Sequence, residues 1–169
     1  FLCVFAVFEV NFATMQPHTV LALFAMLGLV LCFINRPVHK KFKDNKYCQY
    51  TDIGLAFLTV IVFSYLIIHS EPLFKSWWLE GKMLVDRAGE EQKHEVFIGI
   101  AGLILVLEST RRSIGWTMPI LALIFIIYAF VGPYLPKFLI PHGGYTVNRV
   151  VSQSFLQDQG VFGVALRIM

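Results

Sequence analysis

The most distinctive charged residues in this chain form a short cluster between two apolar segments. Glu108 precedes Arg111 by three residues and Arg112 by four, so one face of a helix carries all three side chains. A carboxylate and two guanidinium groups at this spacing can form ion pairs. Inside a membrane, such groups can also serve an ion or proton path. We favour a structural ion pair that also fixes orientation, because it accounts for all three residues without a substrate.

Two further carboxylates lie inside or beside apolar segments. Glu9 falls within 1–10, and we interpret it as a solvated residue at the membrane interface. Asp52 precedes the apolar run 53–68, where it fits a helix N-cap that accepts hydrogen bonds from free backbone amides. With Glu108, these are the only candidates to line an ion path, so a small channel or membrane enzyme is the less favoured hypothesis.

The sequence contains no motif typical of catalysis or metal binding. There is no GxxxxGK[ST] phosphate loop, no HExxH and no CxxC, and Cys3, Cys32 and Cys48 suggest no disulfide framework. We therefore predict a non-enzyme with no catalytic, substrate-binding or metal residue and no cofactor of its own. A helical membrane anchor of a respiratory or redox complex stays open as an alternative, although the histidines fall at expected helix ends or in loops: His18, His39, His69, His94 and His142.

The elements that must position these residues are strongly apolar. The 169 residues are 57% hydrophobic and 15% charged, whereas soluble domains carry about 25% charged residues. Residues 113–131 carry no charge, and this run is close to the roughly 20 residues that cross a bilayer as a helix. Residues 96–107 include no polar side chain, and this shorter run reaches spanning length only if the helix begins near Glu90 or its ends lie in the interface. The sequence therefore predicts an all-α integral membrane helical bundle. We expect about four to five transmembrane helices plus one amphipathic interfacial helix.

We divide the chain into a transmembrane bundle, 1–141, and a C-terminal part, 142–169. Residues 145–159 have apolar positions at helical spacing, which predicts an amphipathic helix along the membrane surface or against another element. The residues after it read as the start of a connection to a further membrane region. Within the bundle, spans are expected near 1–14 (partial), 18–35, 52–69, 93–110 and 113–132.

Charge and aromatic residues orient the expected bundle. The segment 36–46 is rich in lysine and arginine, which places it in the cytoplasm together with Arg111 and Arg112. The loop 71–94 is nearly neutral and is expected outside. The net charge is +3, and the basic residues gather in the connecting segment 36–46, so we expect contact with the lipid bilayer and not with nucleic acid. Three tryptophans are expected to be interfacial anchors: Trp77, Trp78 and Trp116.

Two segments resemble the membrane component of TRAP transporters of the TAXI type. They are LESTRRSIGWTMPILALIFIIYAFVGPYLP at 107–136 and HGGYTVNRVVSQSFLQDQGVFG at 142–163. Weaker similarity lies upstream, at 7–14, 18–37 and 52–57. The resemblance implies the small Q-like membrane component, a scaffold beside a large M-type subunit that holds the substrate and cation sites. Whether the two are fused or separate stays open.

The resemblance also implies partners and a location. A periplasmic TAXI-type substrate-binding protein would deliver an organic acid or similar solute, and a sodium or proton gradient would drive its uptake through the large subunit. The chain would lie in a bacterial or archaeal cytoplasmic (inner) membrane. Gly99 and Gly102 thin one face of the fourth expected helix, and we predict a helix-packing interface there with the large subunit.

Overall fold

The computed structural model describes residues 16–37, 46–78, 84, 92–134, 143–157 and 160–161, and every regular element among them is a helix. This confirms the predicted all-α class. The longer helices are α2 (Pro17–Asn35), α3 (Lys46–Ser70), α4 (Lys93–Ile114) and α5 (Thr117–Val131). The short ones are η2 (Pro72–Trp77) and η5 (Gly132–Tyr134), both 3-10 helices, the α-helix α6 (Val147–Val151) and the π-helix η7 (Ser152–Leu156).

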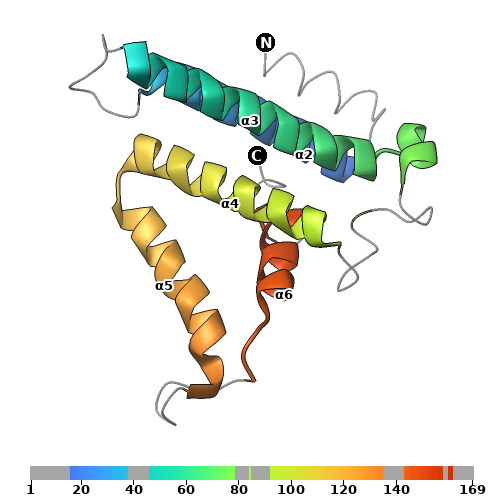
Figure 1. Cartoon of the computed structure of the whole chain (residues 1–169), viewed down its shortest axis with the longest axis vertical. Helices are drawn as coiled ribbons and strands as arrows, with labels where there is room; N and C mark the ends of the chain where they lie inside the picture. The colour runs from blue at the N-terminus through green and yellow to red at the C-terminus, as the bar shows by residue number, and fades with distance from the viewer. Residues whose placement is uncertain are drawn as a thin grey trace.

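Helices α2, α3 and α4 form the packed part of the molecule. α2 and α3 lie side by side, and α4 runs along them (Figure 1). Large apolar side chains fill the space between these helices, because apolar packing and close contact stabilise helix pairs in a membrane as well as in water. The fully buried members include Phe33, Phe63, Leu66, Leu105 and Phe155.

Three described helices are long and apolar enough to cross a membrane. They are Pro17–Asn35, Gln49–Ser70 and Thr117–Tyr134. Helix α4 covers the expected span 93–110, but charged residues lie near both of its ends, from Lys93 and Glu95 to Glu108. The expected partial span 1–14 lies outside the described residues. The chain is therefore an all-α membrane protein, and the total of four to five spans stays a prediction.

The structure corrects one predicted helix start. Asp52 was expected to cap the N-terminus of the third helix, but α3 begins at Lys46, so Asp52 lies inside it. The helix already includes residues 46–51. The Asp52 carboxylate forms an ion pair with the distant Arg112 instead of capping the amides of its own helix. The N-cap prediction was wrong because it weighed only local hydrogen bonding.

Helix α5 turns away from the other helices. Only 11% of its apolar window is buried within the chain, against 39% for the window in α3. Figure 1 shows α5 sloping away from the end of α4 while α6 returns toward the middle of α4. Thr146 caps α6, since its hydroxyl accepts a hydrogen bond from the amide of Arg149 at 3.4 Å. The amphipathic helix was expected either along the membrane surface or against another element. In the structure, α6 and η7 pack against α4.

The turn between α4 and α5 depends on Gly115. Its φ of 102° and ψ of −169° fall in a region that essentially only glycine occupies. A Cβ placed there would meet no atom within 4 Å, so a substitution acts through backbone strain alone. We expect Gly115→Ala to lower the free energy of unfolding in detergent by about 1–3 kcal/mol. The matched control is Gly143→Ala, which also has open space but no positive φ. Equal stability of the two variants would contradict this expectation.

Candidate functional site

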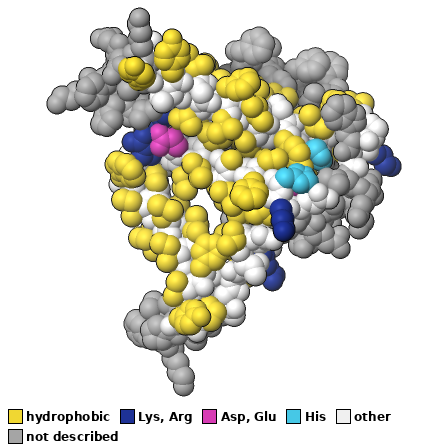
Figure 2. Space-filling view, viewed as in Figure 1, with side chains coloured by type: hydrophobic (Ala, Val, Ile, Leu, Met, Phe, Trp, Pro, Cys, Tyr) yellow, Lys and Arg dark blue, Asp and Glu magenta, His cyan; other side chains and the backbone are white. Residues whose placement is uncertain are grey.

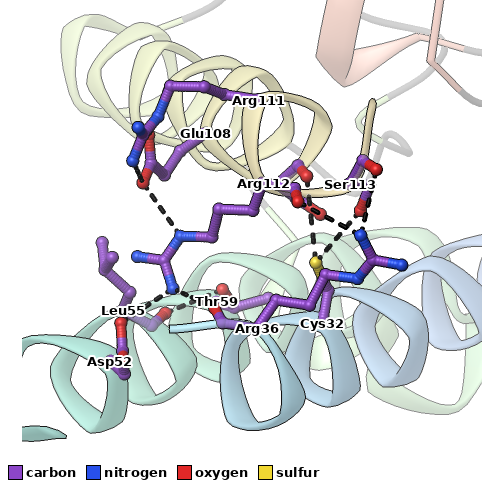
Figure 3. Close-up of polar contacts among 10 residues, drawn as sticks. Cys32, Arg36, Asp52, Leu55, Thr59, Glu108, Arg111, Arg112 and Ser113 are labelled. Carbon is purple, nitrogen blue, oxygen red and sulfur yellow. Dashed lines mark hydrogen bonds and ion pairs between the residues drawn. The ribbon is translucent and has the colours of Figure 1, made fainter. Parts of the chain in front are cut away.

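The charged cluster is part of an ion network that joins three helices (Figure 3). Arg112 extends from α4 with its side chain only 1% exposed. Its Nη1 donates to Oδ1 of Asp52 on α3 at 2.7 Å and to the carbonyl oxygen of Arg36, just after α2, at 2.9 Å. Its Nε donates to Oε1 of Glu108 at 2.9 Å. We call Arg36, Asp52, Glu108, Arg111 and Arg112 the Arg112 network.

Glu108 shares its charge between two arginines. Arg111 binds the carboxylate with two parallel hydrogen bonds, from Nε at 2.7 Å and Nη2 at 2.6 Å. The hydrogen bond to the Glu108 carboxylate raises the pKa of the Arg111 guanidinium, so Arg111 stays charged. Arg111 also lies over the ring of Trp116, 5.1 Å from its centre. The two arginines thus hold the C-terminal end of α4 in one conformation.

Arg36 completes the network from the α2 side. Its Nη1 donates to the carbonyl oxygens of Arg112 at 3.3 Å and of Ser113 at 3.0 Å. The last carbonyls of a helix lack partners inside the helix and carry partial negative charge, so a cation there is favourable. Phe33 lies beneath the Arg112 guanidinium at 4.9 Å. The Cys32 thiol lies 3.4 Å from the hydroxyl of Ser113, which further ties α2 to α4.

The contacts of Arg112 join α2, α3 and α4. A buried cation is stable only when carboxylates or carbonyl oxygens surround it, and Arg112 has both. The sequence reading identified Glu108, Arg111 and Arg112, but it missed Arg36 and Asp52 as their partners. One signal in the sequence pointed toward Arg36. The basic segment 36–46 and the two arginines of α4 were predicted to lie on the same side of the membrane.

Two buried carboxylates lie among helix termini at the other end of the α2–α4 bundle. Glu71 is 5% exposed, and its Oε2 accepts hydrogen bonds from the Thr19 hydroxyl at 2.7 Å and the Gln16 amide at 3.4 Å. Gln16 supplies no side-chain cap to α2, so Glu71 takes that role from a distant part of the chain. A carboxylate at a helix N-terminus is favourable because of the exposed amides and the helix dipole.

Glu95 does the same for α4. Its side chain is fully buried, and its Oε2 accepts the Gln92 amide at 2.8 Å as part of a capping box. The Tyr65 hydroxyl of α3 donates to Oε1 at 3.4 Å. Sequence reasoning missed both buried carboxylates, although the spacing of Gln92 and Glu95 is a recognisable capping signal. They stabilise helix termini and tie neighbouring helices together.

The contact between Thr19 and Glu71 can be tested with an isosteric change. Thr19→Val keeps the shape but leaves a buried carboxylate without its hydroxyl donor. We expect a loss of about 1.5–3 kcal/mol in the free energy of unfolding, as for hydrogen bonds to charged groups. Thr110→Val is the matched control, because among the described residues that hydroxyl bonds only to the Val106 carbonyl of its own helix. Unfolding in detergent measures both variants, and an equal loss would argue against the capping role.

Two histidines at this end pack on one aromatic ring. His69 stacks on Tyr65 at 4.1 Å between ring centres, and His94 meets the same ring edge-on at 6.3 Å. Within the described part of the chain, no group of three or more His, Cys, Asp or Glu side chains could hold a metal ion. His69 and His94 pack on Tyr65 near the end of α3 and the start of α4.

The two glycines of α4 pack inside this chain. A Cβ on Gly99 would lie 2.5 Å from Val151 of α6, and one on Gly102 would lie 2.1 Å from the ring of Phe155 of η7. Both glycines are buried. Within this chain the two glycines therefore pack against the C-terminal segment, and the predicted contact with a large subunit stays a prediction. The glycines let this segment reach α3 as well, where Phe155 meets Phe63 edge-on at 5.6 Å.

The three tryptophans differ in their surroundings. Trp78 donates from its indole nitrogen to the carbonyl of Ile68 at 3.1 Å, which holds it against the end of α3. Trp116 is 63% exposed at the turn between α4 and α5. The side chain of Trp77 lies outside the described residues. Their role as membrane anchors stays a prediction.

Comparison with family models, with curated proteins and with solved structures finds no match to this chain. The fold and its helices alone define its class, an all-α protein with helices that can span a membrane.

Proposed function

We propose that this chain is the small, Q-like scaffold component of a cation-coupled TRAP secondary transporter. The large M-type subunit would hold the substrate and cation sites and use the sodium or proton gradient. A periplasmic TAXI-type binding protein would deliver an organic acid or similar solute. The chain itself would lie in a bacterial or archaeal cytoplasmic membrane and act by bracing its partner. The resemblance of 107–136 and 142–163 to such components supports this proposal.

The exposure of α5 is the observation that carries the proposal. This helix lies within the resembling segment, and only 11% of its apolar window is covered by the rest of the chain. Its outward side chains are large and apolar, including Ile124, Phe125 and Ile127, each more than half exposed. Meanwhile the Arg112 network anchors the helix that precedes α5. A rigid bundle that presents one nearly bare helix suits a scaffold that packs against a larger membrane protein.

A pull-down from native membranes in mild detergent, followed by mass spectrometry, tests the proposal. We expect a much larger multi-spanning chain to co-purify, together with a periplasmic binding protein. A photo-crosslinking residue at Phe125 on α5 should attach to that chain, and the matched position is Phe57, 66% exposed on α3. Recovery of the chain alone, or with a haem- or flavin-bearing subunit, would refute the transporter scaffold. The second outcome would favour a redox-complex anchor.

A further inference from the structure

Helices α4, α5 and α6 frame an opening. Figure 2 shows the background through the molecule between α5 and the elements opposite, with hydrophobic side chains around it. Three connections hold these helices together around the opening. The turn at Gly115 joins α4 to α5, the Tyr145 amide donates to the Ala129 carbonyl of α5 at 3.1 Å, and η7 packs on Gly102 of α4. The opening is therefore part of the fold.

The α5 side of this frame is apolar. The residues of α5 that the rest of the chain partly shields include Ala122, Ile126, Ala129 and Phe130, which recur at helical spacing and so share one face. An apolar opening of this kind does not hold water well, because water there finds no hydrogen-bond partners. In a bilayer, hydrocarbon is the medium that fills it.

A cation lies near the frame where α5 ends. Arg149 is exposed on α6, one turn from Tyr145, and its guanidinium lies over that ring at 5.5 Å. Within the described residues, Arg149 pairs with no carboxylate. Tyr134, 87% exposed, follows α5. An exposed basic side chain that rests on a tyrosine ring is complementary to a lipid phosphate at the membrane interface.

We propose that this frame binds one phospholipid, with the phosphate on Arg149 and an acyl chain in the opening against α5. The enclosed chain exchanges more slowly than lipid on the open faces of the bundle, because the three connections surround it. The site stands independently of the transporter proposal, since every contact it uses lies within this chain.

Native mass spectrometry of the purified chain with added phosphatidylglycerol tests the site. We expect one tightly retained lipid per chain. Arg149→Gln should weaken its retention about fivefold, the effect of one basic residue at an anionic lipid surface. Ala122→Trp should displace it by filling the opening. Leu123→Trp is the matched control, on a neighbouring position that is 45% exposed, and should leave retention unchanged.

Several results would overturn the proposal. One is equal retention by the original chain, Arg149→Gln and Ala122→Trp, which would mean an adventitious lipid only. Another is no retained lipid at all. A third is a crosslink from position 122 to a protein helix instead of to lipid. A thermal melt of each variant establishes that the folded chain is being compared.

Discussion

Replacing Arg112 by glutamine is expected to be the most destabilising single change in the Arg112 network. The substitution leaves Asp52 without its partner in a site where the arginine was 1% and the aspartate 13% exposed. Removing one member of a buried ion pair costs about 3–5 kcal/mol. Because Glu108 keeps its bonds to Arg111 and both carboxylates reach some water, we expect the lower end, about 3 kcal/mol. Unfolding in detergent, monitored by circular dichroism, measures this loss.

The control for Arg112→Gln is a neighbouring arginine in the same turn. Arg111 is 20% exposed and contacts Glu108 and Trp116, which are both close to it in the sequence. Arg111→Gln therefore breaks no described contact with α2 or α3 and should cost about 1 kcal/mol, the upper end for ion pairs that reach water. The double variant Arg112→Gln with Asp52→Asn should lose less than the sum of the single losses, by about 1–3 kcal/mol. Two results would contradict a role of Arg112 in joining the helices. One is equal stability of Arg112→Gln and Arg111→Gln. The other is a double variant whose loss equals the sum of the losses from Arg112→Gln and Asp52→Asn.

Enlarging Gly102 is expected to expel the C-terminal segment from α4. A Cβ there would fall 2.1 Å from two ring atoms of Phe155, a side chain that is fully buried and already in contact with Phe63. The ring cannot move away without leaving the core. We expect Gly102→Ala to cost about 1–3 kcal/mol, the usual range for overpacking, and Gly102→Leu to cost more. The melting temperature of the isolated chain measures both.

Gly28 is the matched control for this change. It also lies within a helix, but a Cβ there would meet nothing within 4 Å. Gly28→Ala should therefore be neutral, or stabilise by up to about 1 kcal/mol through helix propensity. Combining Gly102→Ala with Phe155→Leu should restore part of the lost stability. The contrary result is a Gly102→Ala variant that has the melting temperature of Gly28→Ala but no longer co-purifies with a second subunit. Gly102 would then contact that subunit and not Phe155.

Local patterns predicted the helical class, the bounds of α2 and the pairs formed within one helix. Proline and polar residues around 16–18 and 35–37 bound α2 close to the expected 18–35. The i,i+3 and i,i+4 spacing of Glu108 with Arg111 and Arg112 placed their side chains on one face, where the structure pairs them. These features depend on hydrogen bonds and contacts within a few residues, and such contacts follow directly from the order of residue types.

The partners of these residues were decided only by the tertiary structure. Asp52 and Arg112 are 60 positions apart, and the residues around either one do not predict the other as its partner. The helices of a membrane protein are apolar on every side, so hydropathy does not indicate which face packs inward. For the same reason Gly99 and Gly102 could be recognised as a packing surface, but not assigned to Val151 and Phe155. The sequence alone determined the helical class and the pairs within one helix, whereas packing decided which distant side chains meet.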